Sequence, residues 1–351
     1  MLFGLTVFAQ PMLTLPKYRQ YTLRDGLSQM QVTAMMQDSR GYLWVGTKMG
    51  LNCYNGEHFV NYTSRKFPEM ENDHITKICE DNKGRIWAST LQGIVRIDGK
   101  TLKNFRVVSN PAPYITCDDQ GRLWFTKYNY PDPEISINII DGDSIQELPY
   151  KLHSGQKLPH LDLAFCAKDN ALLIANDTVL YRFKNKIWEP IYKSSKQINF
   201  YSTKKGIWFN ETCLSGLENE EISNFDLFQY DTEGVSVVAR IRNGKMVENL
   251  GLSDSLVFVP VWHFHEQFII TPEGLQYDVF ENLTCSKALF DSDGKLWVGT
   301  EEGVYQLFDD AFTAYKQEFL PQIWAVTEDK NGNLWFFSYL NGIYKQAETT
   351  L

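Results

Sequence analysis

The sequence predicts an all-β protein, a β-propeller, from three observations. The phrase Asp-x-x-Gly-x-(Leu/Ile)-Trp occurs five times in the 351 residues. Four copies continue into a second phrase, Gly/Ser-Thr-x-x-Gly or a close variant of it. The copies recur at roughly 40–45 residues, and each is typical of short strands joined by turns, which together form the repeat signature of a propeller.

The strands and turns of one repeat follow each other in a fixed order. An apolar or alternating stretch, such as residues 32–36, predicts the first strand. The Asp accepts hydrogen bonds from backbone amides two residues on, and the Gly takes the left-handed conformation that closes a short hairpin. The Leu/Ile-Trp pair begins the second strand, and the Gly of the second phrase turns the chain into a third, such as residues 51–54. A longer, more variable outer strand completes a four-stranded blade.

The repeated aspartates and tryptophans are predicted to be structural, because a residue that occurs once in each blade serves the blade. We expect the aspartates to close turns and the indole rings to pack between blades. This structural set consists of Asp38, Trp44, Asp81, Trp87, Asp118, Trp124, Trp208, Asp291, Trp297, Asp329 and Trp335.

Three weaker copies lie between the clear ones. Leu173, Trp208 and Phe268 are predicted to take the Trp position in them, after shortened or altered turns. Residues 225–252 are expected to form an extended outer strand and an insertion. The eight anchor positions then have a mean spacing of about 42 residues, and they are 44, 87, 124, 173, 208, 268, 297 and 335.

Eight copies allow more than one way of closing the ring. Residues 18–26 precede the first copy and can supply the outer strand of the last blade. We therefore expect seven four-stranded blades in a propeller of residues 10–320, with residues 321–351 as a further blade repeat that starts a second propeller. An eight-bladed ring, closed by residues 321–351, is the alternative.

The composition supports one large exported domain. A chain of 351 residues can bury a large core, and an aromatic content of 14% suits packing between blades. The net charge of −9 argues against non-specific binding of nucleic acid, which requires a basic surface.

Residues 1–9 are apolar and end with small residues in cleavage positions, which predicts the remnant of a secretory signal peptide. A frayed apolar N-terminus is the alternative.

The six cysteines are scattered singly, without a Cys-x-x-Cys pair. We expect buried free thiols, and because export is predicted, one disulfide stays open as an alternative.

No catalytic or cofactor signature is present. The sequence has no Gly-x-Ser-x-Gly, phosphate-loop, His-Glu-x-x-His or dinucleotide motif, so neither an enzyme nor a bound cofactor is predicted. His263 and His265 point to one face of an apparent strand and could share a metal ion. No third ligand is identifiable, and therefore no metal site is predicted.

Candidate ligand-binding residues are expected where the repeat breaks, because variable loops on a rigid scaffold carry binding. The aromatic and imidazole side chains at these breaks suit stacking on sugar rings. The alternative is that the aromatic members cover an irregular core. The candidates are Tyr128 and Tyr130 in the third copy, and Trp262, His263 and His265 in the sixth.

Several phrases resemble one known repeat family. They are Gly26-Leu27-Ser28, the run from Gln37 to Thr47, Gly50-Leu51 and Tyr54-Asn55-Gly56. The sequence is similar to the two-component regulator propeller repeat over residues 18–344. The resemblance implies the periplasmic sensor region of hybrid two-component histidine kinases, in which two seven-bladed propellers and an immunoglobulin-like module precede a membrane helix and the kinase. In that family the propeller region detects glycans or their breakdown products.

The resemblance and the lack of catalytic motifs together predict a non-enzymatic, periplasmic sensor propeller of a two-component signal transduction system. The expected partners are an oligosaccharide or glycan fragment and downstream sensor or kinase modules, with relatives anchored in the inner membrane. Kinase activity is expected only in parts outside this sequence. The alternatives are a protein-interaction or homodimerisation scaffold and a propeller glycosidase or lyase.

Overall fold

The chain divides into two compact units, Met1–Asp309 and Asp310–Leu351, which we call the ring unit and the C-terminal unit. The computed structural model describes residues 17–109, 112–128, 134–153, 161–166, 169–176, 178–195, 197–203, 206–212, 225–241, 251–252, 257–261, 266–270, 276–278, 285–308, 323–328, 334–338 and 342–345. Within these residues the secondary structure is β-strand apart from one short 3-10 helix, η1 (Leu23–Asp25). The predicted all-β propeller class is confirmed.

The described strands of the ring unit form seven four-stranded antiparallel sheets. The first sheet contains β2 (Val32–Gln37), β3 (Leu43–Thr47), β4 (Gly50–Tyr54) and β5 (Phe59–Tyr62). The second contains β6 (Ile75–Glu80), β7 (Ile86–Thr90), β8 (Gly93–Asp98) and β9 (Thr101–Arg106). The third contains β10 (Ile115–Cys117), β11 (Leu123–Tyr128), β12 (Glu134–Asp141) and β13 (Ser144–His153). The fourth contains β14 (Leu161–Cys166), β15 (Ala171–Asn176), β16 (Val179–Lys184) and β17 (Ile187–Lys193).

Three further sheets continue in chain order. The fifth contains β18 (Gln197–Thr203), β19 (Gly206–Thr212), β20 (Phe225–Asp231) and β21 (Gly234–Ile241). The sixth contains β22 (Gly251–Leu252), β23 (Val257–Val261), β24 (Glu266–Ile270) and β25 (Gln276–Asp278). The seventh contains β26 (Cys285–Phe290), β27 (Leu296–Thr300), β28 (Gly303–Phe308) and β1 (Lys17–Tyr21).

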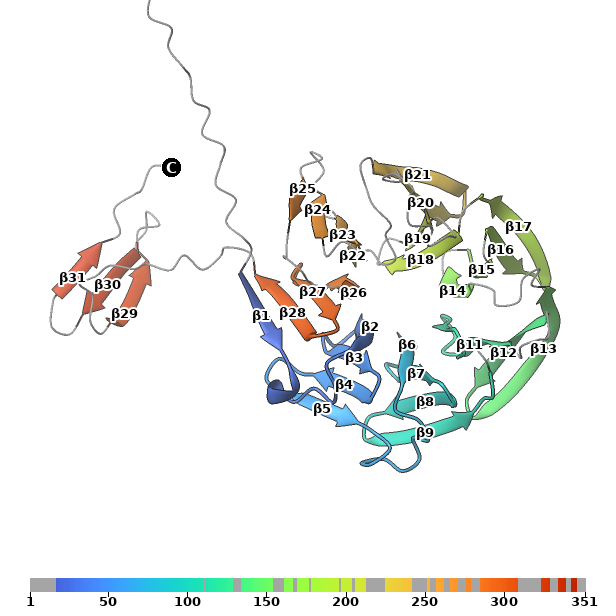
Figure 1. Cartoon of the computed structure of the whole chain (residues 1–351), viewed down its shortest axis with the longest axis horizontal. Coiled ribbons are helices and arrows are strands. Elements are labelled where there is room, and N and C mark those ends of the chain that lie inside the picture. Colours follow the sequence, from blue (N-terminus) through green and yellow to red (C-terminus); the bar gives the residue numbers. More distant parts are fainter. Residues whose placement is uncertain are drawn as a thin grey trace, which may run out of the picture. The chain divides into compact units, whose positions relative to one another are not determined.

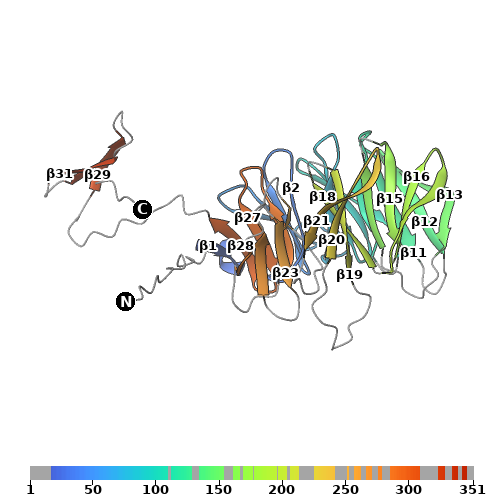
Figure 2. The ribbon, with the colours of Figure 1, turned by 90° about the horizontal axis from the view of Figure 1, so that it is seen from above.

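The sheets of the ring unit stand around a common centre, with the first strand of each sheet innermost (Figure 1). Neighbouring first strands contact each other from β26 through β2, β6, β10 and β14 to β18, and β22 contacts β26. Viewed at right angles, the strands run between two faces of the ring (Figure 2). The loops that join successive strands therefore alternate between these two faces.

The seventh sheet is completed by the strand nearest the N-terminus. β1 pairs antiparallel with β28, in a register that sets Lys17 opposite Phe308 and Tyr21 opposite Val304. This pairing confirms the expected outer strand from the segment before the first repeat. Tyr21 is only 2% exposed, and its ring stacks on Trp297 with the ring centroids 5.6 Å apart. The first and last parts of the ring are thus joined by both backbone pairing and side-chain packing.

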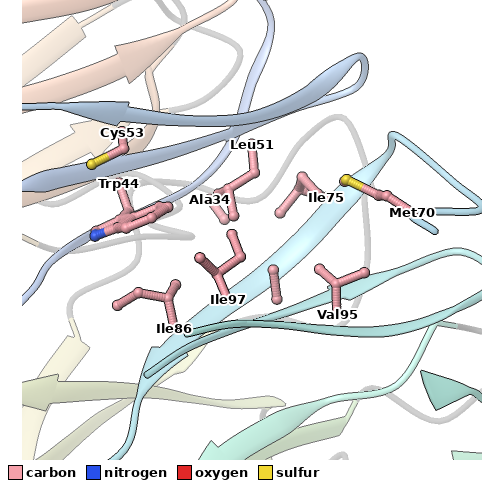
Figure 3. Packing of buried hydrophobic residues seen from close by; sticks show 10 residues of the cluster. Ala34, Trp44, Leu51, Cys53, Met70, Ile75, Ile86, Val95 and Ile97 are labelled. Carbon is pink, nitrogen blue, oxygen red and sulfur yellow. The ribbon is translucent and has the colours of Figure 1, made fainter. Parts of the chain in front are cut away.

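The hydrophobic core lies between neighbouring sheets. Trp44 of the first sheet packs in one cluster with Ile86 and Ile97 of the second, and Figure 3 shows these side chains interlocking. Trp87 and Trp124 likewise belong to clusters that include the next sheet along the chain. These three indoles, and Trp297 in the same way, therefore fill the space between their own sheet and the next.

The second phrase often begins with Gly because adjacent sheets approach closely at that point. A Cβ atom at Gly46 would lie 2.6 Å from Cγ2 of Ile75, on the first strand of the next sheet. A Cβ atom at Gly299 would lie 2.5 Å from Cγ1 of Val32 in the same way. These two glycines are required by contact between sheets, since neither adopts a positive φ.

The weaker copies follow the repeat with one exception. Leu173 and Trp208 lie on second strands, as predicted, and Leu173 faces the fifth sheet within its core cluster. The prediction for Phe268 was wrong, because this residue lies on β24, the third strand of its sheet. By register the Trp position belongs to Phe258, which pairs with Gly251 as Trp44 pairs with Met36.

The prediction for residues 225–252 was also wrong. Instead of one outer strand and an insertion, this stretch contains the third and fourth strands of the fifth sheet, β20 and β21, and the first strand of the sixth, β22. The error and the misplaced anchor have one cause. The turn between β22 and β23 lacks the Asp-x-x-Gly phrase that marks a second strand in the sequence.

The C-terminal unit contains a three-stranded antiparallel sheet. Its strands are β29 (Ile323–Glu328), β30 (Leu334–Ser338) and β31 (Gly342–Lys345). Trp335 lies on the second strand and pairs with Thr327, as Trp44 pairs with Met36 in the first sheet.

Candidate ligand-binding face

One face of the ring is formed by repeated Asp turns. We call it the turn face, and it carries the connections between first and second strands at 38–42, 81–85, 118–122 and 291–295. In the first of these, Oδ1 of Asp38 accepts the backbone N–H groups of Arg40 at 3.0 Å and Tyr42 at 2.9 Å. The other three aspartates accept the amides two and four residues on in the same way. The carboxylate thus substitutes for missing backbone partners in each turn.

The second oxygen of each turn carboxylate binds the repeated indole. Nε1 of the Trp donates to Oδ2 of the Asp six residues earlier in all four turns. The distances are 3.0 Å for Trp44 and Asp38, and 2.8 Å for Trp87 and Asp81, Trp124 and Asp118, and Trp297 and Asp291. The Asp therefore fixes both the turn and the indole group that packs against the next sheet. The spacing of the motif alone did not reveal this second role.

Neighbouring turns are also tied to each other. Ser39 donates to the Glu80 carboxylate from both its backbone N–H, at 2.7 Å, and its hydroxyl, at 2.6 Å. Asn82 donates to the backbone oxygen of Asp119 at 2.5 Å, and the backbone N–H of Ser292 donates to Gln37 at 2.7 Å. Ser39, Asn82 and Gln37 of this face thus help to hold neighbouring sheets together.

The fourth sheet keeps a turn carboxylate but has Leu173 where the indole would lie. Asp169 instead accepts the Tyr230 hydroxyl of the fifth sheet at 2.5 Å and Lys184 at 2.5 Å, and it faces Arg182 at 3.4 Å. Burial and the hydrogen bond to Asp169 raise the pKa of Tyr230 to about 12. A polar network between sheets thus replaces the Asp–Trp pair where the repeat is degenerate.

The opposite face of the ring carries connections that differ in length from one sheet to the next. We call it the variable face, and it carries the connections between second and third strands and those between one sheet and the next. The segment from η1 to β2 is held here by the first sheet, since the backbone N–H of Ser28 donates to Asn52 at 2.8 Å. Between β5 and β6, Asp73 accepts the backbone N–H and the hydroxyl of Ser64, and Met70 is fully buried. These two loops are therefore held in place by hydrogen bonds and by a buried side chain.

Exposed apolar side chains occur on these connections in the first and second sheets and between the second and third. Met49 and Leu91 occupy the same turn of adjacent sheets and are 57% and 48% exposed, and Val108, between β9 and β10, is 71% exposed. Such apolar tips are not needed for packing within the ring, so they are available to a ligand or partner.

Cationic and aromatic groups accompany these apolar tips. Partial burial and the positive charge of Lys48 lower the pKa of His74 from its ordinary value of 6.5. Nζ of Lys77 lies 5.5 Å from the centre of the Tyr114 ring. These groups add positive charge, an imidazole and a phenol to the region of the first three sheets.

The residues proposed from the sequence are placed unevenly. Tyr128 ends β11 and is 1% exposed, packed in the core cluster between the third and fourth sheets. Its ring is therefore buried, as the alternative of a covered irregular core requires. The remaining candidates, Tyr130, Trp262, His263 and His265, lie outside the described residues, as does Asp329.

The strands that flank these remaining candidates are described. β11 and β12, and likewise β23 and β24, are second and third strands, so the ends of β11 and β23 lie at the variable face. Sequence reasoning pointed to breaks in the repeat but missed Lys48, Met49, His74 and Leu91. They lie within regular turns or conventional loops, where nothing in the pattern singles them out.

The described residues contain neither a metal-binding cluster nor a membrane-spanning helix. No group of three His, Cys, Asp or Glu side chains in the described ranges is placed to hold a metal ion. The same part of the chain contains no helix with the length and apolar character needed to cross a bilayer.

Comparison with known proteins found similar repeats in other sequences. The sequence model of the two-component regulator propeller matches residues 26–49 and 69–92. A stretch of 52 residues is 46% identical to histidine kinase P4 of Formosa agariphila, and it makes up 15% of this chain and 4% of that protein.

Two solved structures share the fold at low sequence identity. The extracellular domain of a putative hybrid two-component system from B. thetaiotaomicron is 16% identical with a TM-score of 0.56, and the match covers 95% of this chain and 46% of that one. A streptogramin B lyase is 15% identical with a TM-score of 0.62, and the match covers 83% of this chain and 97% of that one. At such identities these likenesses show the propeller fold alone.

Proposed function

The chain carries repeats of the two-component regulator propeller, and from this premise we propose that it is a non-enzymatic sensor domain of a two-component system. The observation that carries the proposal is the recurrence of the family phrase through the chain, which builds the turns of the ring itself. The proposed location is the periplasm, in keeping with the extracellular placement named for the similar B. thetaiotaomicron domain. The signal passes to a histidine kinase in downstream modules.

We propose the variable face as the binding surface and a carbohydrate fragment as the ligand. On the turn face, Ser39 and Asn82 are engaged in hydrogen bonds between neighbouring turns, whereas Met49 and Leu91 offer exposed apolar contact on the opposite side. Tyr114 and His74 supply flat rings with polar edges nearby, a combination that suits a sugar ring with its apolar face and peripheral hydroxyls. Tyr130, Trp262, His263 and His265 lie outside the described residues and stay proposed ligand contacts on the basis of the sequence.

Calorimetric titration of the full chain with host, plant and microbial oligosaccharides tests this proposal. We expect saturable heat with at least one class of glycan. The double variant Met49→Ser with Leu91→Ser should weaken binding by about five-fold or more, because each loses buried apolar contact with the ligand. The control Tyr42→Ser changes an exposed aromatic residue of the turn face and should leave binding unchanged. Absence of heat with every glycan class, in a folded protein, contradicts a sugar site here.

The same exposed apolar tips favour one other function, a protein-docking scaffold. Met49, Leu91 and Val108 lie on one face and would be covered in a homodimer or a complex. Light scattering at increasing concentration distinguishes the two proposals. A mass that doubles with concentration, and returns to that of one chain in the Met49→Ser, Leu91→Ser variant, supports the scaffold over the monomeric receptor.

We propose the domain boundaries from the order of the repeats. Residues 10–320 contain the ring, and residues 321–351 contain a further blade repeat, since β29–β31 repeats the order of the first three strands of a blade. The proposed signal-peptide remnant, residues 1–9, lies outside the described residues.

A further inference from the structure

Two cysteines from neighbouring sheets meet beside the ring centre. Cys79 lies on β6 and Cys117 ends β10, the first strands of the second and third sheets, which contact each other. Their sulfur atoms are 2.9 Å apart. Both side chains pack against the core cluster between these sheets, which contains Trp87 and Phe125. The pair is therefore part of the interface that holds the two sheets together.

No other described cysteine has this arrangement. Cys53, Cys166 and Cys285 are buried free thiols, each within a separate hydrophobic cluster. Burial raises the pKa of Cys53 to about 11 and that of Cys285 to about 12, and none of these three thiols shares its cluster with another cysteine. Cys79 and Cys117 are partly exposed rather than fully buried. A disulfide has a sulfur–sulfur length of about 2.05 Å, so a closing movement of roughly 1 Å joins them.

We propose that Cys79 and Cys117 form a disulfide that links the second and third sheets of the ring. The bond joins positions 38 residues apart in sequence. It would constrain the unfolded chain and hold two sheets together at the inner strands, where the described contact between sheets is otherwise non-covalent. An oxidising compartment outside the cytoplasm favours such bonds.

The reaction is thiol–disulfide exchange with a disulfide oxidant, for which oxidised glutathione serves as the probe. The Cys79 thiolate attacks one sulfur of the oxidant, the oxidant's disulfide breaks, and one glutathione leaves as a thiolate that takes up a proton. Cys117 then loses its proton and attacks the Cys79 sulfur of the mixed disulfide, which releases the second glutathione. Two protein thiols are oxidised and one oxidised glutathione is reduced to two thiols. Because burial and the neighbouring Cys79 raise the pKa of Cys117 well above its usual range, we expect the second step to be the slower one.

Thiol counting on the full chain tests the proposal. After incubation with oxidised glutathione and removal of the oxidant, the denatured protein should show two fewer free thiols than the six in the sequence. Peptide mapping without reductant should then identify a Cys79–Cys117 cross-link. Cys79→Ser should abolish the loss of a thiol pair, whereas Cys166→Ser should leave it intact. Six free thiols in the oxidised wild-type chain, or a pair that maps to other cysteines, overturns the proposal.

A melting measurement on the same samples gives a second test. Oxidation should raise the midpoint of thermal unfolding of the wild-type chain by on the order of 5 °C, as expected for a cross-link of this loop length in a domain of this size. Reductant should reverse the rise. The Cys79→Ser chain should melt at the same temperature with and without oxidant, which separates the cross-link from any general effect of glutathione. An equal rise in that variant contradicts the proposed bond.

Discussion

The indole nitrogen of Trp87 donates a 2.8 Å hydrogen bond to the carboxylate of Asp81, six residues earlier. The same carboxylate oxygen receives Nε of Arg85 at 2.6 Å, and the other oxygen closes the turn through two backbone amides. Asp81 is 4% exposed and Trp87 is fully buried. The charge of a buried aspartate is thus compensated by donors from its own hairpin, and the loss of that charge should be felt throughout the interface.

The substitution Asp81→Asn should lower the free energy of unfolding by about 3 kcal/mol. The amide oxygen of Asn can still accept backbone N–H groups, but its NH₂ group would face the indole N–H of Trp87 and the guanidinium of Arg85, leaving both donors unpaired. Urea denaturation of the full chain measures the change.

Asp291→Asn is the matched control for this variant. Asp291 binds the Trp297 indole and two turn amides in the same way, but the basic residue of its turn, Lys295, pairs with Asp293 instead. The expected cost is therefore smaller, about 1–2 kcal/mol. Equal costs at the two positions would show that the Arg85 pair contributes nothing.

Tyr21→Ala should destabilise the ring unit by about 3–5 kcal/mol, as large aromatic truncations in a core do. The ring of Tyr21 stacks on Trp297, and its hydroxyl contacts Tyr54 at 3.2 Å and Gln306 at 3.1 Å. Tyr18→Ala changes the same strand at a side chain that is 54% exposed, and it should cost less than about 1 kcal/mol. Similar losses in both variants would mean that strand pairing alone closes the ring.

Gly46→Ala should destabilise the protein by about 1–3 kcal/mol through overpacking. The added methyl group would lie 2.6 Å from Cγ2 of Ile75, and the β-strand backbone at Gly46 gives it no other direction. The double variant Gly46→Ala with Ile75→Ala removes Cγ2 of Ile75, the atom at the contact point. Its loss of stability should be smaller than the sum of the two single losses, and strict additivity would exclude the contact as the cause.

Acidification should lower the free energy of unfolding through the protonation of His74. The folded-state pKa of this imidazole lies below its ordinary 6.5, because partial burial and Lys48 disfavour the charged form. The unfolded chain then binds more protons in the window just below pH 6.5, so the contribution of His74 to stability is complete above that pH and is lost as the pH falls through the folded pKa. NMR titration should give a value below 6.5 that rises in Lys48→Met. A value at or above 6.5 would contradict the described environment.

The repeat made most of the ring predictable, because each motif residue has one structural task. Asp38 and Gly41 specify a hairpin, and a Trp at a fixed distance specifies a strand that faces the next sheet. The anchor of the sixth sheet was wrongly assigned to Phe268, because the segment before its second strand, β23, has no Asp-x-x-Gly phrase. Only the backbone register shows that Phe258 takes the anchor position. The pairing of β1 with β28 was predictable because the segment before the first repeat had no other sheet to complete.

The candidate face was harder to predict, because its residues are defined by position rather than by type. Tyr128 stood out as an aromatic residue at a break in the repeat, yet it is buried in the core. Met49 and Leu91 lie in regular turns, and their exposure follows only from which end of the sheet the turn occupies. The contact between Cys79 and Cys117 likewise depends on the convergence of two inner strands, which no sequence spacing encodes.

The pairing of β1 with β28 has a mechanical consequence. Lys17 lies opposite Phe308, so the chain enters and leaves the ring at the same end of one two-stranded ladder. Tension applied between the segments on either side of the ring would load that ladder at a single end and unzip it one hydrogen-bonded pair at a time, rather than shear all pairs together. Such a pull therefore loads the pairing of β1 with β28 in the direction in which it resists least.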